Sequence, residues 1–137
     1  MEKEENNINL LSFIVKNQKQ TFHELLNQHL AKSKKTDPEI YNDANLTKGT
    51  YSRLRNIHHK PSKNSIICLA IGLDLSYIET LILLKSEGYT LSNSSRFDLI
   101  VKFHIQKKSK IYDINIDLEK NNCELLGKHK KKEKIKI

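Results

Sequence analysis

Hydrophobic residues recur at helical spacing along most of this chain, and polar residues that can cap a helix precede the hydrophobic runs. Thr21 and Glu24 form a capping-box sequence before apolar positions that extend to Leu30, because the Thr hydroxyl can accept from the Glu backbone amide while the Glu side chain reaches back. Ser76 and Glu79 repeat this sequence further along. The pattern predicts an all-α protein. Other N-cap signals lie at Asp37, Thr47, Ser62 and Ser95.

Three stretches differ from this regular pattern. Residues 66–73 are apolar nearly all round, which predicts a central, buried helix. Residues 8–15 are apolar without a clean period, and we expect a short leading helix that packs on the domain. Residues 111–126 alternate apolar and polar positions as a strand would. Because the chain offers no second strand for pairing, the prediction there is a short helix.

Residues 38–56 are predicted to form two short helices joined at Asn45. A sharp turn between helices favours a residue with positive φ, and Asn is the usual choice after Gly. Leu46 is expected to point inward. Gly49 lowers the stability of the second helix by about 1 kcal/mol relative to Ala. Glycine is present there either because another backbone approaches closely or because the position tolerates it. The inward side chains of that helix are expected to be Tyr51, Leu54 and Ile57.

The positive charge of the chain is concentrated in two segments. The 137 residues carry a formal net charge of +8 and a sequence pI of about 9.4. Residues 128–137 hold six lysines and one glutamate, and outside the two segments the chain is slightly acidic. An anionic partner is therefore expected. The other segment, residues 47–63, holds no acid and five cations: Lys48, Arg53, Arg55, Lys60 and Lys63.

No arrangement of residues indicates a catalytic site, a cofactor or a bound metal, so we do not expect an enzyme. The sequence has no glycine-rich phosphate loop. Asp113, Asp117 and Glu119 are close enough to suggest paired acids or metal ligands, but without a second ligand cluster a solvated helix face is the better interpretation. His58 and His59 are adjacent and would point apart, so exposed histidines near a phosphate backbone are favoured over metal ligands.

The cysteines and the hydropathy of the chain bear on its compartment. Cys68 and Cys123 form no C-x-x-C pair, and Cys68 lies in an apolar run, where a small packed thiol is expected. The sequence shows no signal peptide and no apolar run of membrane length. We therefore expect a cytoplasmic, reduced protein without a membrane partner.

The basic segment of residues 47–63 has a layout that suits nucleic acid. Its charges lie on the second helix of the hinged pair and in the loop that follows. A helix fits the major groove of DNA, where Arg or Lys can donate to guanine acceptors, and flanking cations can neutralise phosphate without reading sequence. The alternative is a solvated basic helix without a binding role. The expected phosphate contacts are Arg55, Asn56, His58, His59, Lys60 and Lys63.

A family resemblance supports this interpretation. Residues 44–54, Ala-Asn-Leu-Thr-Lys-Gly-Thr-Tyr-Ser-Arg-Leu, resemble the turn and recognition helix of the lambda-repressor-like family (Cro/C1, XRE-type helix-turn-helix). Lys60-Pro61-Ser62, followed by an apolar helix, is similar to the next segment of that family. The resemblance implies an all-α, five-helix DNA-binding domain at residues 21–91.

A narrower resemblance extends to the C-terminal part. Its residues 88–100, 111–115 and 125–127 are similar to a bacterial subgroup that appends a small helical extension and is sometimes joined to macrodomain modules. This implies a short helical C-terminal extension at residues 92–127. The remaining segments are expected to be an N-terminal extension at residues 1–20 and a flexible, disordered basic tail at residues 128–137.

The resemblance also assigns roles to single residues. Asp37 stands where the family often has a Gln on phosphate, Tyr41 replaces the usual small residue, and Arg55 replaces the usual Glu after Leu54. The family's base contacts fall at Thr47, Lys48, Gly49, Ser52 and Arg53.

These features predict a DNA-binding transcriptional regulator that reads the major groove with the helix Thr47–Asn56. We expect a dimer, with half-sites about one helical turn apart. A second hypothesis is a protein-interaction module, such as an antitoxin or phage-defence component, and Asp37, Tyr41 and the acidic extension favour it. A third hypothesis is RNA binding through the basic tail. A homodimer and a separate protein partner both stay open.

Overall fold

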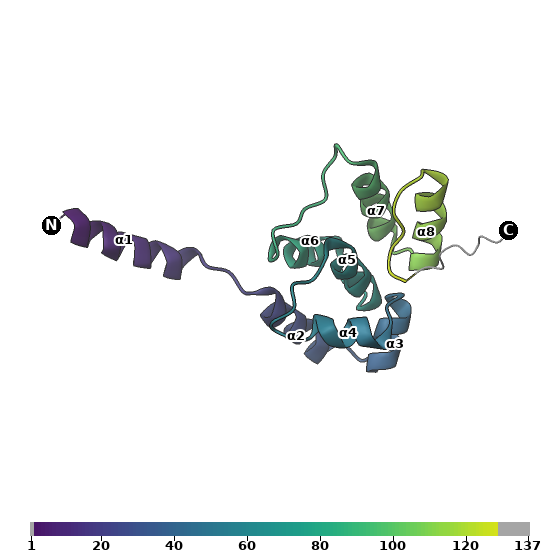
Figure 1. The fold of residues 1–137 in the computed structure, drawn as a ribbon, viewed down its shortest axis with the longest axis horizontal. Helices are drawn as coiled ribbons and strands as arrows, with labels where there is room; N and C mark the ends of the chain where they lie inside the picture. The colour runs from purple at the N-terminus through teal and green to yellow at the C-terminus, as the bar shows by residue number, and fades with distance from the viewer. Residues whose placement is uncertain (1, 129–137) are drawn as a thin grey trace.

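The computed structural model describes the backbone of residues 2–128 and the side chains of residues 9–128. Over this range the regular structure is entirely helical, which confirms the all-α prediction. The expected disorder of the basic tail concerns residues 129–137, which lie outside the described residues. The helices, drawn in Figure 1, are α1 (Glu2–Asn17), α2 (Phe22–Lys32), α3 (Asp37–Asp43), α4 (Lys48–Leu54), α5 (Lys63–Gly72), α6 (Tyr77–Lys85), α7 (Arg96–Lys107) and α8 (Ile111–Lys120).

The N-caps follow the sequence closely. Capping boxes begin α2 at Thr21 and α6 at Ser76, as predicted, and side-chain caps at Thr47, Ser62 and Ser95 begin α4, α5 and α7. The prediction of Asp37 as an N-cap is wrong. Thr36 caps α3 instead, and together with Glu39 it forms a capping box.

The helix α5 is the centre of the fold. All side chains from Ile66 to Ala70 are buried, as its apolar sequence predicted, and α3 and α6 pack on it. The contact with α3 is close because Gly72 has no side chain: a Cβ built there would lie 2.6 Å from the Ile40 carbonyl oxygen and 2.7 Å from the Ala44 Cβ. Small residues at this crossing therefore set the position of α3.

The C-terminal helices α7 and α8 form a hairpin whose apolar side chains join the same hydrophobic core. Lys108 ends α7 in the left-handed conformation, with φ of 62°. The prediction of a helix after residue 110 is confirmed, but α8 ends at Lys120. The next residues turn back toward α5, and Leu126 is completely buried.

The helix α1 is not packed on the domain, so that expectation is wrong. Figure 1 shows it apart from the other helices, at the end of a short connection, and every side chain from residue 9 to residue 20 is exposed. Ile57 is a second error, because its side chain is 71% exposed rather than buried. No helix within residues 2–128 combines the length and the hydrophobicity needed to cross a bilayer.

The close crossing of α3 and α5 yields a stability prediction. Gly72→Ala should lower the free energy of unfolding by about 2 kcal/mol, since the new methyl group would overlap backbone and Cβ atoms of α3. Gly49→Ala is the matched control, because its Cβ would meet only the Arg53 side chain, at 3.7 Å. Urea unfolding should show Gly49→Ala to be more stable than wild type by up to about 1 kcal/mol. Equal stability of Gly72→Ala and wild type would contradict the close crossing.

Candidate nucleic-acid interface

The turn between α3 and α4 is built around Asn45. Its φ is 56°, as the sequence predicted for a residue that ends one helix and allows the next to begin. The Leu46 amide donates to the Tyr41 carbonyl at 2.9 Å, and the Leu46 side chain is buried. Thr47 then caps α4. The turn is thus fixed by its backbone and by one apolar side chain.

One face of α4 packs on the core and the other is open to solvent. Tyr51 and Leu54 are buried, which confirms their predicted inward orientation. The residues assigned to base contacts are all exposed on the same short helix and its cap: Thr47, Lys48, Gly49, Ser52 and Arg53.

The two cations on the open face of α4 are not neutralised. Within the described residues, neither Lys48 nor Arg53 forms an ion pair. The Arg53 guanidinium donates to the Thr50 hydroxyl at 3.0 Å, and Thr50 also accepts from the Thr47 hydroxyl at 3.0 Å. Both cations can therefore meet an anionic partner without breaking a salt bridge.

Asp37 has a structural role that the sequence did not reveal. The Tyr51 hydroxyl donates to Asp37 Oδ1 at 2.7 Å, and the Arg55 guanidinium lies 3.6 Å from the same oxygen and 5.9 Å from the centre of the Tyr51 ring. Tyr41 packs on Tyr51 with their ring centres 5.5 Å apart. Asp37, Tyr41 and Arg55 thus join α3 to α4 through Tyr51.

Two of the residues expected to contact phosphate, Lys60 and Lys63, form ion pairs with acidic side chains. Lys60 Nζ lies 2.9 Å from a carboxylate oxygen of Glu87, yet the Lys60 side chain stays 69% exposed. Lys63 Nζ lies 2.7 Å and 2.9 Å from the two carboxylate oxygens of Asp98, whose side chain is only 4% exposed. Lys63 therefore joins the start of α5 to α7 and is not free to bind phosphate.

The other expected phosphate contacts follow α4. Asn56 and His58 are exposed, and His59 is half-buried. The Asn56 side-chain oxygen accepts from the His58 amide at 2.9 Å, so this loop has a defined conformation beside the open face of α4.

Residues 124–128 form a C-terminal strap that was not predicted from the sequence. It crosses the turn between α3 and α4: the Asn45 side-chain amide donates to the Leu126 and Lys128 carbonyls at 3.0 Å and 2.7 Å, and the Lys128 amide donates to the Asn45 carbonyl at 2.8 Å. Asn64 on α5 donates to the Leu125 carbonyl and accepts from the Gly127 amide. The strap therefore ends at the beginning of α4.

The strap also borders a shallow notch at the beginnings of α4 and α5. The notch has a volume of about 250 Å³, and both threonines of the cap of α4 line it together with Lys128. Thr47, Thr50 and Lys128 thus share one polar surface, although Lys128 lies 78 or more positions from the threonines in the chain.

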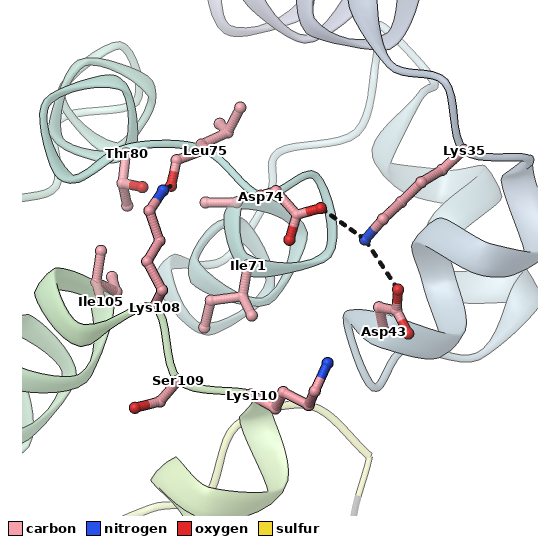
Figure 2. Close-up of a pocket in the computed structure, with 11 residues that line it drawn as sticks. Lys35, Asp43, Ile71, Asp74, Leu75, Thr80, Ile105, Lys108, Ser109 and Lys110 are labelled. Atoms are coloured by element: carbon pink, nitrogen blue, oxygen red, sulfur yellow. Dashed lines mark hydrogen bonds and ion pairs between the residues drawn. The ribbon is translucent and has the colours of Figure 1, made fainter.

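A second hollow, of about 310 Å³, lies between the core helices and the loop that joins α7 to α8. Figure 2 shows Lys35 between Asp43 and Asp74, with its Nζ at 2.8 Å and 3.0 Å from their carboxylates and also donating to the Gly72 carbonyl. Burial lowers the pKa of Lys35, but hydrogen bonds to the two aspartates outweigh it and the net pKa is raised. The Lys35 ammonium group and the two carboxylates neutralise one another, so they hold neighbouring core segments together.

His104 is a buried histidine with two partners. Its Nδ1 lies 2.8 Å from the Ser109 hydroxyl and its Nε2 lies 2.7 Å from an Asp117 carboxylate oxygen. Figure 2 shows the Ser109 hydroxyl turned away from Asp74 and Lys110. The three side chains therefore join α7 to α8, and Asp117 is not part of a purely solvated face as the sequence suggested. No group of three metal-ligating side chains converges in the described part of the chain.

The ion pair between Lys63 and Asp98 can be tested separately from binding. Lys63→Met should lower the free energy of unfolding by about 2 kcal/mol or more, because it leaves a buried carboxylate without its cation. Lys60→Met is the matched control and should leave the stability nearly unchanged, because the Lys60 side chain is 69% exposed and solvent screens its ion pair. Thermal or urea unfolding of both variants measures the difference, and equal stabilities would contradict a structural role for Lys63.

The raised pKa of Tyr51 predicts that the stability of the protein changes at high pH. Burial, together with the hydrogen bond to Asp37, raises the pKa of Tyr51 from 10.0 to about 12. A raised pKa means that the folded state favours the neutral phenol, so its stabilisation is present below pH 10 and is lost as the pH rises toward 12. Tyr51→Phe should cost about 1 kcal/mol at neutral pH. The difference from wild type in urea unfolding should shrink above pH 10, and a constant difference would contradict the assignment.

This protein matches no protein-family model, no curated protein and no solved structure in comparisons with known proteins. Its candidate interface is therefore defined by its own geometry. That geometry consists of an exposed basic face on α4, a turn fixed at Asn45, and a strap that brings Lys128 to the same place.

Proposed function

We propose that this protein is a DNA-binding transcriptional regulator that reads the major groove with α4. The observation that carries the proposal is the exposed face of α4, where Lys48 and Arg53 have no ion pair within the described residues while hydroxyl groups lie between them. Arg, Lys and hydroxyl side chains are the donors that contact base edges and phosphates in DNA. The base contacts of this proposal are Thr47, Lys48, Gly49, Ser52 and Arg53.

The proposed domain is a lambda-repressor-like helix-turn-helix of the XRE type, formed by α2–α6. The order of these helices, the tight turn at Asn45 and the burial of α5 support this proposal. In such a domain α3 crosses the DNA backbone and α4 enters the groove. A bacterial, cytoplasmic regulator acting as a dimer is part of the same proposal.

The proposed phosphate contacts are fewer than the sequence suggested. Asn56, His58 and His59 follow α4 and keep that role. Arg55 and Lys60 have acidic neighbours but are themselves 44% and 69% exposed, so these exposed cations can turn from the carboxylates to phosphate at little cost. Lys63 is left out because Asp98 holds it in a buried pair.

A protein-interaction module is the second candidate, and exposed apolar side chains favour it. The described part of α1 exposes Leu10, Leu11, Phe13, Ile14 and Val15. Ile78 and Ile82, one turn apart on α6, are 61% and 51% exposed. Clusters of this kind commonly mark contacts between proteins.

Arg53→Ala tests the proposed DNA contact. Fluorescence anisotropy with DNA duplexes selected for binding should show a loss of about 1–3 kcal/mol in binding free energy, since a cation facing a base edge is removed. In wild type, log K should fall with log salt by about 0.9 for each phosphate contacted. Equal binding of Arg53→Ala and wild type would contradict the role of α4.

Gly49→Ala supplies a second and more selective test. The fold does not need glycine at this position, because a Cβ would meet only the Arg53 side chain. If α4 lies against DNA, the added methyl group should weaken binding by roughly tenfold, as expected when an extra methyl group is forced into a close-packed contact, while the protein itself becomes more stable. Unchanged binding would indicate that no DNA group approaches Gly49.

The protein-interaction alternative predicts a different outcome. Size-exclusion chromatography with light scattering, on protein purified with its cellular partners, should then reveal one partner in fixed stoichiometry. Ile78→Ser with Ile82→Ser should release that partner, whereas Arg53→Ala should leave it bound. A stoichiometric complex of this kind, without preference for any duplex, would decide against the DNA proposal.

A further inference from the structure

The helix α1 has an apolar face that its own domain does not cover. A helix of this length draws most of its stability from the packing of such a face rather than from its backbone hydrogen bonds alone. The polar residues Ser12 and Lys16 lie on the opposite side of the helix. The apolar side chains are 42–81% exposed, and they are Leu10, Leu11, Phe13, Ile14 and Val15.

An apolar groove on α6 is a matching surface. It has a volume of about 750 Å³, and its lining includes Ile78, Leu81, Ile82 and Tyr89. Ile78 and Ile82 are 61% and 51% exposed, whereas the Tyr89 hydroxyl donates to the Pro61 carbonyl at 3.1 Å. The lining follows about two turns of α6, and the apolar residues of α1 occupy about one and a half turns, so one surface fits along the other.

Within one copy of the chain these two surfaces stay apart. Figure 1 shows α1 extending away from the other helices, and every side chain from residue 9 to residue 20 is exposed. Each copy therefore offers one exposed helix face and one exposed groove. Two such copies can satisfy each other in a symmetric interface, in which the helix of each meets the groove of the other.

The area of contact favours this exchange over simpler pairings. Burial of a large apolar side chain removes roughly 60–120 Å² from water, and the lower value applies to side chains that are already partly covered. Five side chains of α1 and four of the groove then give about 500 Å² for one helix in one groove. Two reciprocal contacts reach about 1,000 Å², which a specific interface needs, whereas pairing α1 with α1 or α6 with α6 buries about half as much.

We propose that two copies of this chain form a dimer by exchanging α1, with the apolar face of each helix seated in the α6 groove of the other copy. An amphipathic helix in an apolar groove is a common mode of recognition between proteins. The inference rests on the dimer that is part of the proposed function, but the interface itself does not require DNA. Because neither surface includes a residue of α4, the basic face of both copies stays exposed.

The first measurement is the mass of the full chain in solution, by light scattering and sedimentation over a range of concentrations without DNA. Wild type should have twice the 16.0 kDa of one chain. The helix variant is Phe13→Ser with Ile14→Ser, and the groove variant is Ile78→Ser with Ile82→Ser. Each should raise the dissociation constant of the dimer roughly a hundredfold or more, since apolar contacts are lost from both halves of the interface.

The matched control removes an apolar pair of the same spacing from another helix. Leu99 and Phe103 lie one turn apart on α7 and are 44% and 55% exposed. Leu99→Ser with Phe103→Ser should leave the dimer intact. Circular dichroism of all three variants checks that the domain is folded.

Hydrogen exchange supplies a second measurement on the same variants. In the groove variant the sequence of α1 is unaltered, but the helix loses its partner. Amides of residues 9–17 should therefore exchange much faster than in wild type, while those of the buried helix α5 should not change. Equal protection of α1 in the two proteins would overturn the exchange of helices.

The outcomes separate this inference from the DNA contact of α4. A wild type with the mass of one chain at every concentration overturns the interface, even if Arg53→Ala weakens duplex binding. A dimer that survives in the groove variant indicates pairing of α1 with α1, and one that survives in the helix variant indicates pairing of α6 with α6, so either result overturns the exchange. A dimer that both variants dissociate, in a protein that binds no duplex, supports the interface while the proposed function falls.

Discussion

The positive φ of Asn45 is the constraint on which the candidate interface depends. It ends α3, lets Leu46 enter the core and leaves Thr47 free to cap α4. The same residue binds the strap through its side chain and its carbonyl oxygen. A local backbone requirement and a contact across 81 residues of sequence therefore meet at one position, and the close crossing of α3 and α5 at Gly72 holds that position against the core.

The distribution of charge in the fold differs from that along the chain. In sequence, residues 47–63 carry five cations and no acid. The fold brings Asp37, Glu87 and Asp98 to three of these cations. The two cations of this segment that have no acidic partner within the described residues are Lys48 and Arg53, and Lys128 of the strap lies beside the cap of α4. A smaller and more defined basic surface follows, which suits a helix entering a groove better than a diffuse basic patch does.

Local signals account for what the sequence predicted well. N-caps, the turn at Asn45 and the inward positions of α4 depend on residues within one or two helical turns, so they can be read from neighbouring side chains. Thr36 could have been recognised as a cap from Glu39 three residues later. The strap at Asn45, the pairing of Lys63 with Asp98 and the separation of α1 from the domain depend on contacts between distant segments. A single sequence does not specify such contacts before the core is assembled.

Selection of bound duplexes from a random-sequence pool, with the full chain as the bait, is the decisive test of whether α4 reads DNA. Successive rounds should enrich related half-sites about one helical turn apart. The enrichment should disappear when α4 is altered at Lys48 and Arg53 together. Recovery of sequences no different from the starting pool, by a folded protein, would contradict the claim that α4 reads DNA.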